Sequence, residues 1–301
     1  MKIVIGSRGS ALALWQANWV RDRLAAAGHE VEIRVIRTSG DRMPQVPLED
    51  SGVKGLFIKE IEEALAEGAI DLAVHSLKDM PGAQPPGLTL AAVPAREDAR
   101  DALVSREGAT FAELPPGARL GTSSIRRQSQ LRHLRPDVAM VPMRGNVGTR
   151  LRKLEEGQCD ALVLAAAGLI RLGFESKIRQ YFSADQLCPA VGQGALAIET
   201  RQGDEPVLCA VEPLDDPVAH RAVRAERALL RHLGGGCAVP IAAYAEPIGD
   251  GLSLMGVVAS PDGSRVVRAE TTGSASDPES LGLSVAEELL RLGTRAILEA
   301  V

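Results

Sequence analysis

One cysteine, Cys237, follows three consecutive glycines in the segment from Leu233 to Pro240. Glycine loses more backbone freedom on ordering than any other residue, so a run of three suits a tight turn or the close approach of a bulky group. A helical pattern leads in from Glu226, and Pro240 limits the direction of the chain that follows. A thiol in such a loop could carry a covalent group. The alternative is a glycine that ends the helix, followed by a small buried cysteine.

A second candidate for chemistry is a carboxylate at the end of a predicted strand. Ile70 to Val74 is an apolar run that continues into a short polar segment containing Ser76, Lys78 and Asp79, and Pro81 closes this segment. Ligands of open α/β sheets bind beyond the carboxyl ends of the strands, so these three side chains are expected in a binding site. The alternative is an ordinary surface pair of Lys and Asp.

Three turns that lead from a predicted strand into a predicted helix carry arginine. They are Gly6 to Ser10, Thr122 to Ser124 followed by Arg126 and Arg127, and Arg144 to Arg150. Free backbone N–H groups at a helix N-terminus bind anions, and the planar guanidinium group pairs well with carboxylates. Positive charge in a first helical turn is unfavourable for the helix itself, which favours a ligand-binding role for these arginines. The alternative is ordinary turns with solvated arginine side chains.

The periodicity predicts two α/β units followed by a smaller α+β unit. The predicted strands of the α/β units are Lys2 to Ile5, Val31 to Ile36, Ile70 to Val74, Asp101 to Val104, Arg119 to Gly121, Val138 to Val141, Asp160 to Leu164 and Ala195 to Thr200, and the predicted helices include Ala11 to Ala27, Phe57 to Ala66 and Ile125 to Leu134. A Gly/Pro-rich connection from Leu187 to Ala195 predicts a hinge. The last unit is predicted as a helix over Pro217 to Leu233, three antiparallel strands within Ile241 to Thr271, and one final helix over Pro278 to Glu299.

Composition excludes several classes of protein. The net charge of −5 argues against general nucleic-acid binding, and no apolar run is long enough to predict a membrane span. The four cysteines are widely separated, which suggests neither a zinc site nor a disulfide framework, so no metal is expected. Of the 34 basic residues 28 are arginine, which fits carboxylate recognition or simply genomic composition. The N-terminal segment does not predict a signal peptide, and we expect a cytoplasmic protein.

Seven segments, taken in order, closely resemble the porphobilinogen deaminase (hydroxymethylbilane synthase) family over essentially the whole chain. They are Gly6 to Leu14, Lys54 to Phe57, Ala73 to Pro81, Gly121 to Arg127, Arg144 to Arg150, Pro189 to Gly194, and the signature from Glu226 to Pro240 around Cys237. Any one of them could occur by chance, whereas all of them in order are highly specific.

The resemblance implies a transferase that adds four porphobilinogen molecules head to tail, with loss of ammonia, onto a covalently bound dipyrromethane, and then releases hydroxymethylbilane by hydrolysis. Cys237 is then the attachment residue, through a thioether, and Asp79 the catalytic residue that stabilises the positive azafulvene-like intermediate. The residues implied to bind the cofactor also include Ser76, Lys78, Asp79, Thr122, Ser124, Arg126, Arg127, Arg144, Gly145 and Asn146. The residues implied to bind substrate are Arg8, Ser10, Phe57, Arg144, Arg150, Arg171 and Gln193. Asp41, Lys54 and Lys59 are implied to belong to a mobile loop over the site.

The fold implied by the resemblance is α/β, with two hinged lobes like those of periplasmic binding proteins and a small C-terminal α+β domain with a three-stranded antiparallel sheet. Residues 1–94 and 195–213 would form domain 1 with the catalytic Asp, 100–189 the arginine-rich domain 2, and 217–301 domain 3 with the cysteine. The protein is expected to be a monomer without nucleic-acid or membrane partners. Its product is expected to pass to uroporphyrinogen-III synthase.

Two other classes of protein share part of this pattern. A two-lobed carboxylate-binding protein without catalysis would share the α/β lobes and the arginines, but it has no need of a cysteine on a glycine loop and normally needs an export signal. A phosphate-dependent transferase would be expected to carry a GxxxxGK loop, which the sequence lacks.

Overall fold

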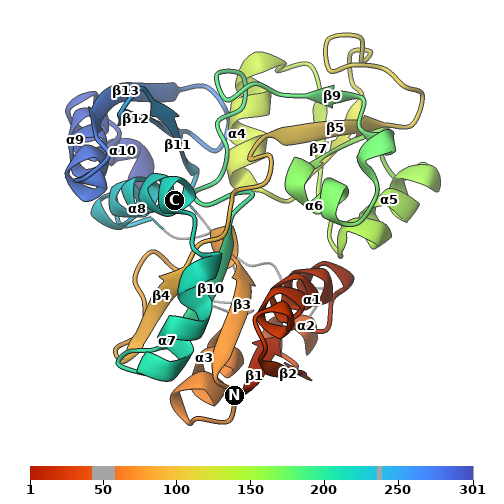
Figure 1. Cartoon of the computed structure of the whole chain (residues 1–301). Coiled ribbons are helices and arrows are strands. Elements are labelled where there is room, and N and C mark those ends of the chain that lie inside the picture. Colours follow the sequence, from red (N-terminus) through yellow and green to blue (C-terminus); the bar gives the residue numbers. More distant parts are fainter. Residues whose placement is uncertain (43–57, 236–238, 301) are drawn as a thin grey trace. The chain divides into compact units, whose positions relative to one another are not determined.

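The computed structural model describes residues 1–42, 58–235 and 239–300, and for residues 41 and 42 the backbone alone (Figure 1). The chain divides into two compact units. The first contains Met1–Glu97 and Ala195–His220, and the second contains Asp98–Gly194 and Arg221–Val301. The first unit therefore consists of two stretches of chain that are separated by about a third of the sequence.

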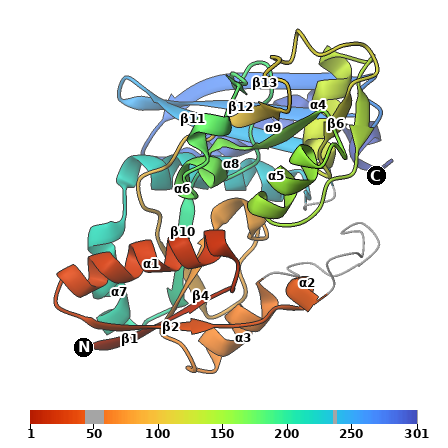
Figure 2. The ribbon, with the colours of Figure 1, turned by 90° about the vertical axis from the view of Figure 1, so that its right-hand side faces the viewer.

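The first unit is built on a five-stranded sheet with helices on both faces. Its elements are β1 (Lys2–Ser7), α1 (Ala11–Ala26), β2 (Glu30–Val35), α2 (Ser39–Arg42), α3 (Lys59–Ala66), β3 (Leu72–Ser76), the 3-10 turn η1 (Leu77–Asp79), β4 (Leu88–Ala92), β10 (Leu196–Arg201), α7 (Glu205–Val211) and the 3-10 turn η3 (Glu212–Leu214). Apolar residues of α1 pack with Ile3 and Ile5 of β1, whereas Ile61 and Leu65 of α3 pack with Ala73 of β3. Figure 2 shows α1 and α3 on opposite sides of the sheet.

The strand order of this sheet is β2-β1-β3-β10-β4. The three N-terminal strands β2, β1 and β3 pair in parallel, whereas β10 runs antiparallel to both of its neighbours, β3 and β4. A strand from beyond residue 195 thus completes a sheet that began at residue 2. The carboxyl ends of β1 and β3 lie at the same edge, and this is the edge where the predicted site residues follow.

The second unit contains two sheets. The first has the order β7-β6-β8-β5-β9, in which β6 pairs in parallel with β7 and β8, and β5 runs antiparallel to β8 and β9. Its elements are β5 (Asp101–Ser105), β6 (Arg119–Gly121), α4 (Ile125–Leu134), β7 (Ala139–Val141), α5 (Val147–Glu155), β8 (Ala161–Ala165), α6 (Ala166–Arg171), the 3-10 turn η2 (Glu175–Lys177) and β9 (Gln180–Tyr181). Separate apolar clusters cover its two faces, one around Leu103 and Leu131, the other around Leu151 and Leu162.

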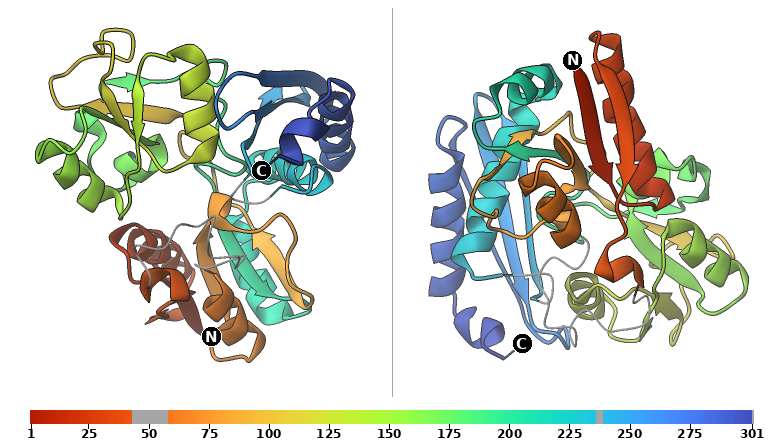
Figure 3. Two further views of the ribbon diagram at one scale, coloured as in Figure 1. Left: turned by 180° about the vertical axis from the view of Figure 1, so that it is seen from behind. Right: turned by 90° about the horizontal axis from the view of Figure 1, so that it is seen from below.

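The other sheet of this unit is the antiparallel meander β11-β12-β13. Its elements are α8 (Pro217–His232), β11 (Ile241–Ile248), β12 (Gly251–Ala259), β13 (Val266–Ser274), α9 (Pro278–Arg291) and α10 (Arg295–Leu298). Leu229 of α8 and Leu289 of α9 belong to one apolar cluster with Leu254 of the sheet. Figure 3 shows this C-terminal sheet and its helices, in blue, from two further sides. The predicted fold class is confirmed: two α/β sheets and a three-stranded antiparallel sheet.

Two predicted boundaries differ from the structure in an informative way. The single helix predicted over Pro278 to Glu299 is wrong, because α9 ends at Arg291 and a separate short helix begins at Arg295. Gly293 has a φ of 85°, a left-handed conformation that ends a helix. The strand predicted over Ile70 to Val74 instead covers Leu72–Ser76, so the strand extends to the first residue of the polar segment.

Candidate functional site

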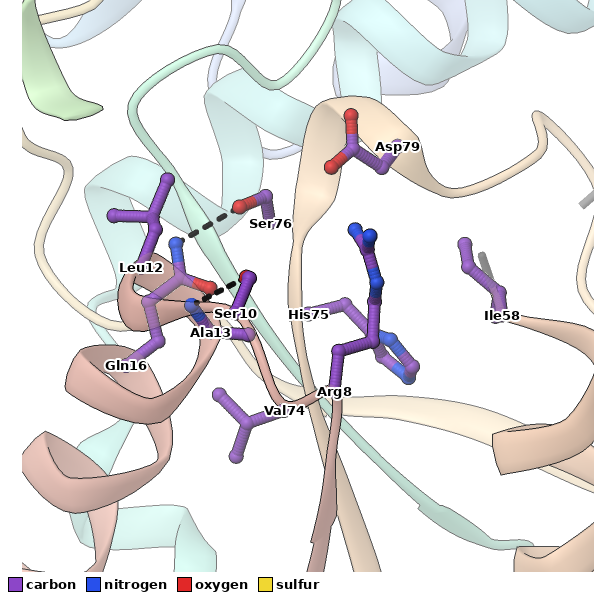
Figure 4. Close-up of a pocket in the computed structure, with 10 residues that line it drawn as sticks. All are labelled: Arg8, Ser10, Leu12, Ala13, Gln16, Ile58, Val74, His75, Ser76 and Asp79. Carbon is purple, nitrogen blue, oxygen red and sulfur yellow. Dashed lines mark hydrogen bonds between the residues drawn. The ribbon is translucent and has the colours of Figure 1, made fainter. Parts of the chain in front are cut away.

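An open hollow of about 420 Å³ lies in the first unit, at the carboxyl ends of β1 and β3. Figure 4 shows the side chains that line it. They are Arg8, Ser10, Leu12, Ala13, Gln16, Ile58, Val74, His75, Ser76 and Asp79. Two segments that lie about 70 residues apart in the chain, the turn after β1 and the end of β3, therefore contribute to one pocket, and we call it the Asp79 pocket.

Hydrogen bonds fix the polar wall of the Asp79 pocket. The hydroxyl of Ser10 accepts a hydrogen bond from the N–H of Ala13 (3.3 Å) and so caps the N-terminus of α1. Gln16, one turn further along α1, is 2% exposed and donates from Nε2 to the hydroxyl of Ser76 (2.8 Å). This bond ties α1 to the end of β3, so the orientation of Ser76 is set by the protein itself.

Asp79 is the last residue of η1, the tight turn that follows β3. Leu77, at the start of this turn, is buried and donates its N–H to the carbonyl of Ala195 (3.1 Å), and Met80 donates back to Leu77 (3.0 Å). The turn is thus closed by its own hydrogen bond and tied to Ala195 at its start, while the Asp79 side chain remains exposed. Figure 4 shows the side chain of Arg8 extending from the end of β1 toward Asp79. Lys78, also predicted for the site, is half-buried and lies outside the pocket lining.

In the second unit, the arginine pair at the start of α4 surrounds an internal carboxylate. Arg126 and Arg127 are each 5% exposed, and Asp101, at the start of β5, is 0% exposed. The Nη1 of Arg126 lies 2.7 Å from Oδ2 of Asp101, while Nε and Nη2 of Arg127 lie 2.9 and 2.7 Å from Oδ1. Burial alone would raise the pKa of Asp101, but the charges and hydrogen bonds of the two arginines hold it well below its ordinary value.

Gln193 joins the same network, which we call the Asp101 network. Its Nε2 donates to Asp101 (3.0 Å) and to the carbonyl of Ala99 (2.7 Å). Sequence reasoning expected Arg126, Arg127 and Gln193 to face a ligand, and it missed Asp101. The available signal was an acidic residue that opens an otherwise apolar strand. Ligand binding by these three residues stays a prediction.

The remaining predicted residues of the second unit lie at the ends of β6, β7 and β8. Asn146 caps α5 by accepting from the N–H of Thr149 (2.8 Å), and Arg150 donates from Nε to the carbonyl of Gly145 (2.7 Å). Arg144 is half-buried. Thr122 is buried, and its Oγ accepts from the N–H of Ser124 (3.3 Å).

Ser124 is the residue that precedes α4, and its side chain makes no capping hydrogen bond. The hydroxyl before the helix is therefore not engaged by the first turn. Arg171 is 9% exposed and donates from Nη2 to the carbonyl of Gly194 (2.7 Å). Substrate binding by Arg171 stays a prediction.

Several predicted residues lie outside the described residues: Cys237, Lys54 and Phe57, together with the side chain of Asp41. Lys59 is exposed and its Nζ lies 3.7 Å from Glu63 on the next turn of α3. Helix α8, which precedes Cys237 in the chain, ends in a Schellman motif. In this motif the N–H of Gly235 donates to the carbonyl of Leu230 (3.0 Å), and the N–H of Gly234 donates to the carbonyl of Arg231 (3.1 Å).

Two other cysteines are buried within the second unit. Burial raises the pKa of the Cys159 thiol to about 11 and that of Cys188 to about 12. Both are therefore protonated at neutral pH and poor nucleophiles. Within residues 1–42, 58–235 and 239–300, no group of His, Cys, Asp and Glu could hold a metal ion, and no helix could cross a membrane.

Comparison with known proteins was made on both sequence and structure. Residues 3–208 match the family model "Porphobilinogen deaminase, dipyromethane cofactor binding domain", and residues 220–291 match "Porphobilinogen deaminase, C-terminal domain". The porphobilinogen deaminase of Roseiflexus castenholzii is 54% identical over 298 residues, and the alignment covers 98% of both chains. The porphobilinogen deaminase of Geobacter sulfurreducens is 51% identical in an alignment of 302 residues that covers 100% of this chain and 95% of the relative.

Among solved structures, the methionine binding protein MetQ aligns with a TM-score of 0.46 and 13% identity, over 75% of this chain and 93% of that chain. The family models together extend over both units, and the relatives match from one end of the chain to the other. The chain therefore belongs to the porphobilinogen deaminase family.

Proposed function

We propose that this enzyme condenses four porphobilinogen molecules head to tail onto a covalently bound dipyrromethane, with loss of ammonia at each addition, and then releases hydroxymethylbilane by hydrolysis. Relatives that share more than 50% sequence identity with this chain are named porphobilinogen deaminase. The observation that carries the catalytic part is the Asp79 pocket, where an exposed carboxylate and an arginine from another strand line one hollow.

Asp79 is the proposed catalytic residue. Loss of ammonia from the aminomethyl group of porphobilinogen leaves positive charge on the pyrrole, and a fixed carboxylate at that point lowers the energy of the transition state. Anchoring of η1 through Leu77 and Met80 holds the Asp79 backbone in place before substrate arrives. Arg8 and the capped N-terminus of α1 supply N–H donors suited to the substrate carboxylates.

The donor set of the chain fits a cofactor that carries carboxylates. Arg144 precedes α5 and Arg150 lies in its first turns, while Ser76 ends β3 and Lys78 follows it. We propose that these residues, with Thr122, Ser124, Arg126, Arg127, Gly145 and Asn146, hold the dipyrromethane, and that Arg8, Ser10, Phe57, Arg144, Arg150, Arg171 and Gln193 bind substrate. When bound, the dipyrromethane supplies the free pyrrole position to which the first substrate is added. Lys54 is proposed to belong to a loop that covers the site. The expectation that Lys59 and Asp41 belong to this loop is corrected, because Lys59 is the first residue of α3 and Asp41 lies in α2.

Cys237 is the proposed attachment residue for the dipyrromethane. The mass of the denatured protein, produced in cells able to make porphobilinogen, tests this assignment. We expect an excess over the sequence mass equal to two linked pyrrole units, and the loss of this excess in Cys237→Ser. The matched control is Cys209→Ser, which changes an exposed cysteine on α7 and should keep the excess. An unmodified mass in the parent protein would contradict the proposal.

Further assignments rest on the family and on the sequence. We propose that residues 1–94 and 195–213, 100–189 and 217–301 behave as three domains, in agreement with the separate apolar cores of the three sheets. The enzyme is proposed to act as a cytoplasmic monomer and to pass its product to uroporphyrinogen-III synthase.

A further inference from the structure

Three ionisable side chains lie on the α3 side of the first sheet. Glu199 of β10 is 0% exposed and His75 of β3 is 5% exposed, while Glu62 of α3 is half-buried. Glu199 lies opposite Ala73 in the antiparallel register, and His75 is two residues further along β3, so both side chains point to the same face. Ala73 packs against α3, and this identifies the face as the one that Glu62 covers.

These side chains lack the hydrogen bonds that buried polar groups normally make. The Nε2 of His75 lies 3.4 Å from Oε2 of Glu199, close enough for electrostatic attraction. Among the described residues, none forms a hydrogen bond with that nitrogen, with either carboxylate oxygen of Glu199 or with Oε1 of Glu62. A buried ion without hydrogen-bond partners is costly, so the net charge that these side chains can carry together is limited.

Glu62 ionises near neutrality. Burial and, to a lesser extent, the charge of Glu199 raise its pKa to about 7, and His75 opposes this rise. Several other charged groups on the surrounding described elements have partners of their own. Glu60 accepts from Ser39, Lys59 pairs with Glu63, Arg201 pairs with Asp204 and Asp71, and Lys2 and Arg34 pair with Glu32.

His75 connects the cluster to the Asp79 pocket. Of the three cluster residues, His75 is the one whose side chain lines the pocket. Figure 4 shows the side chain of Arg8 running past the His75 ring toward Asp79. We propose, building on the proposed function, that the net charge of the Glu62–His75–Glu199 cluster sets how strongly Arg8 binds a substrate carboxylate. All three are positioning residues, since they act on substrate through Arg8.

The direction of the effect follows from charge. When half-buried Glu62 loses its proton to solvent, the negative charge of the cluster increases. The guanidinium group is then attracted toward the sheet, and it binds the substrate carboxylate less tightly. The KM for porphobilinogen should therefore rise as pH increases through about 7, whereas kcat, which depends on Asp79, should change less.

The test compares Glu62→Gln with Glu63→Gln in the complete, cofactor-loaded enzyme. Glu63 is one residue along α3, exposed and paired with Lys59, so its replacement removes the same charge away from the cluster. We expect the KM of the parent and of Glu63→Gln to rise about threefold between pH 6 and 8.5, and the KM of Glu62→Gln to stay level over this range.

Thermal unfolding over the same pH range gives a readout that does not need turnover. A carboxyl group whose pKa is raised in the folded state lowers the stability of the protein as pH rises. For Glu62 this loss occurs between its ordinary pKa of 4.5 and its raised pKa of about 7. This loss should be smaller in Glu62→Gln than in Glu63→Gln by a few degrees of Tm. If Glu62→Gln follows the parent in both measurements, or flattens only the Tm profile while KM still rises, the inference is wrong. Absence of porphobilinogen turnover in the parent would instead contradict the proposed function.

Discussion

The Asp79 pocket and the Asp101 network use the same residue types in opposite ways. In both, arginine follows a strand and stands near the start of a helix, and an aspartate lies nearby. In the first unit the aspartate is exposed and the arginine reaches a pocket. In the second unit the aspartate is 0% exposed, and two arginines and Gln193 surround it. In the second unit, Asp101 thus cancels one of the two positive charges that Arg126 and Arg127 could offer to a ligand.

This difference gives each arrangement a distinct dependence on its aspartate. An exposed carboxylate contributes little to folding and is available for chemistry, whereas a buried carboxylate that neutralises two guanidinium groups is needed for stability. Substitutions at the two aspartates should therefore separate activity from folding.

The largest expected effect is on turnover in Asp79→Asn. The amide keeps the shape of the side chain but cannot offset the positive charge that forms as ammonia leaves. We expect kcat to fall about a hundredfold or more with an unchanged melting temperature, measured by ammonia release and by thermal unfolding. Asp22→Asn, an exposed change on α1 at a residue that pairs with Arg21, is the matched control. Near-normal turnover in Asp79→Asn would remove the residue from its proposed role.

The next effect is on folding, in Asp101→Asn. Removal of this carboxylate leaves Arg126 and Arg127 as buried charges without a counterion. We expect the free energy of unfolding to fall by about 3–5 kcal/mol, measured by denaturant titration. Asp160→Asn is a useful comparison, because Asp160 pairs with Arg119 in a more exposed place and should cost far less. Equal unfolding midpoints for the two variants would contradict the structural role of the Asp101 network.

A smaller effect should distinguish the arginines themselves. Lysine keeps the charge but cannot form two parallel hydrogen bonds to a carboxylate. In Arg8→Lys we expect KM for porphobilinogen to rise about tenfold with little change in stability. In Arg127→Lys we expect a loss of stability, since Arg127 donates two hydrogen bonds to Asp101. The comparison fails if Arg8→Lys unfolds early or if Arg127→Lys is as stable as the parent.

The smallest effect is the pH dependence of stability, which should have opposite signs in the two regions. Because the pKa of Asp101 is lowered in the folded state, this residue stabilises the protein at pH values above its ordinary pKa of 3.8. The stabilisation is lost as pH falls below 3.8. The raised pKa of Glu62 lowers stability as pH rises from 4.5 to about 7. Thermal unfolding from pH 2.5 to 8 should show a steep acid arm that is shallower in Asp101→Asn, and a shallow neutral slope that is reduced in Glu62→Gln.

Sequence reasoning placed most of the fold and part of the site. The strand pattern of Ile3 and Ile5, and the helix pattern that begins at Ala11, are local signals, and both appear in the structure. The placement of Asp79 after a strand end came from the same local reasoning. The Asp101 network and the Glu62–His75–Glu199 cluster join side chains from distant segments, and no local pattern indicates whether a charged side chain meets solvent, a ligand or another charge. The family resemblance, not periodicity, implied that the chain returns to its first domain near residue 195.

The position of β10 has a consequence for how the chain is made. A ribosome must synthesise about 200 residues before the strand that separates β3 from β4 exists. Until then the N-terminal segment can pair β2, β1 and β3 but leaves one edge of β3 open, and an unpaired edge is prone to association with other nascent chains. Polypeptides that stop short of Leu196 should consequently require chaperones and be cleared by proteases, even though every residue that lines the Asp79 pocket has already been translated.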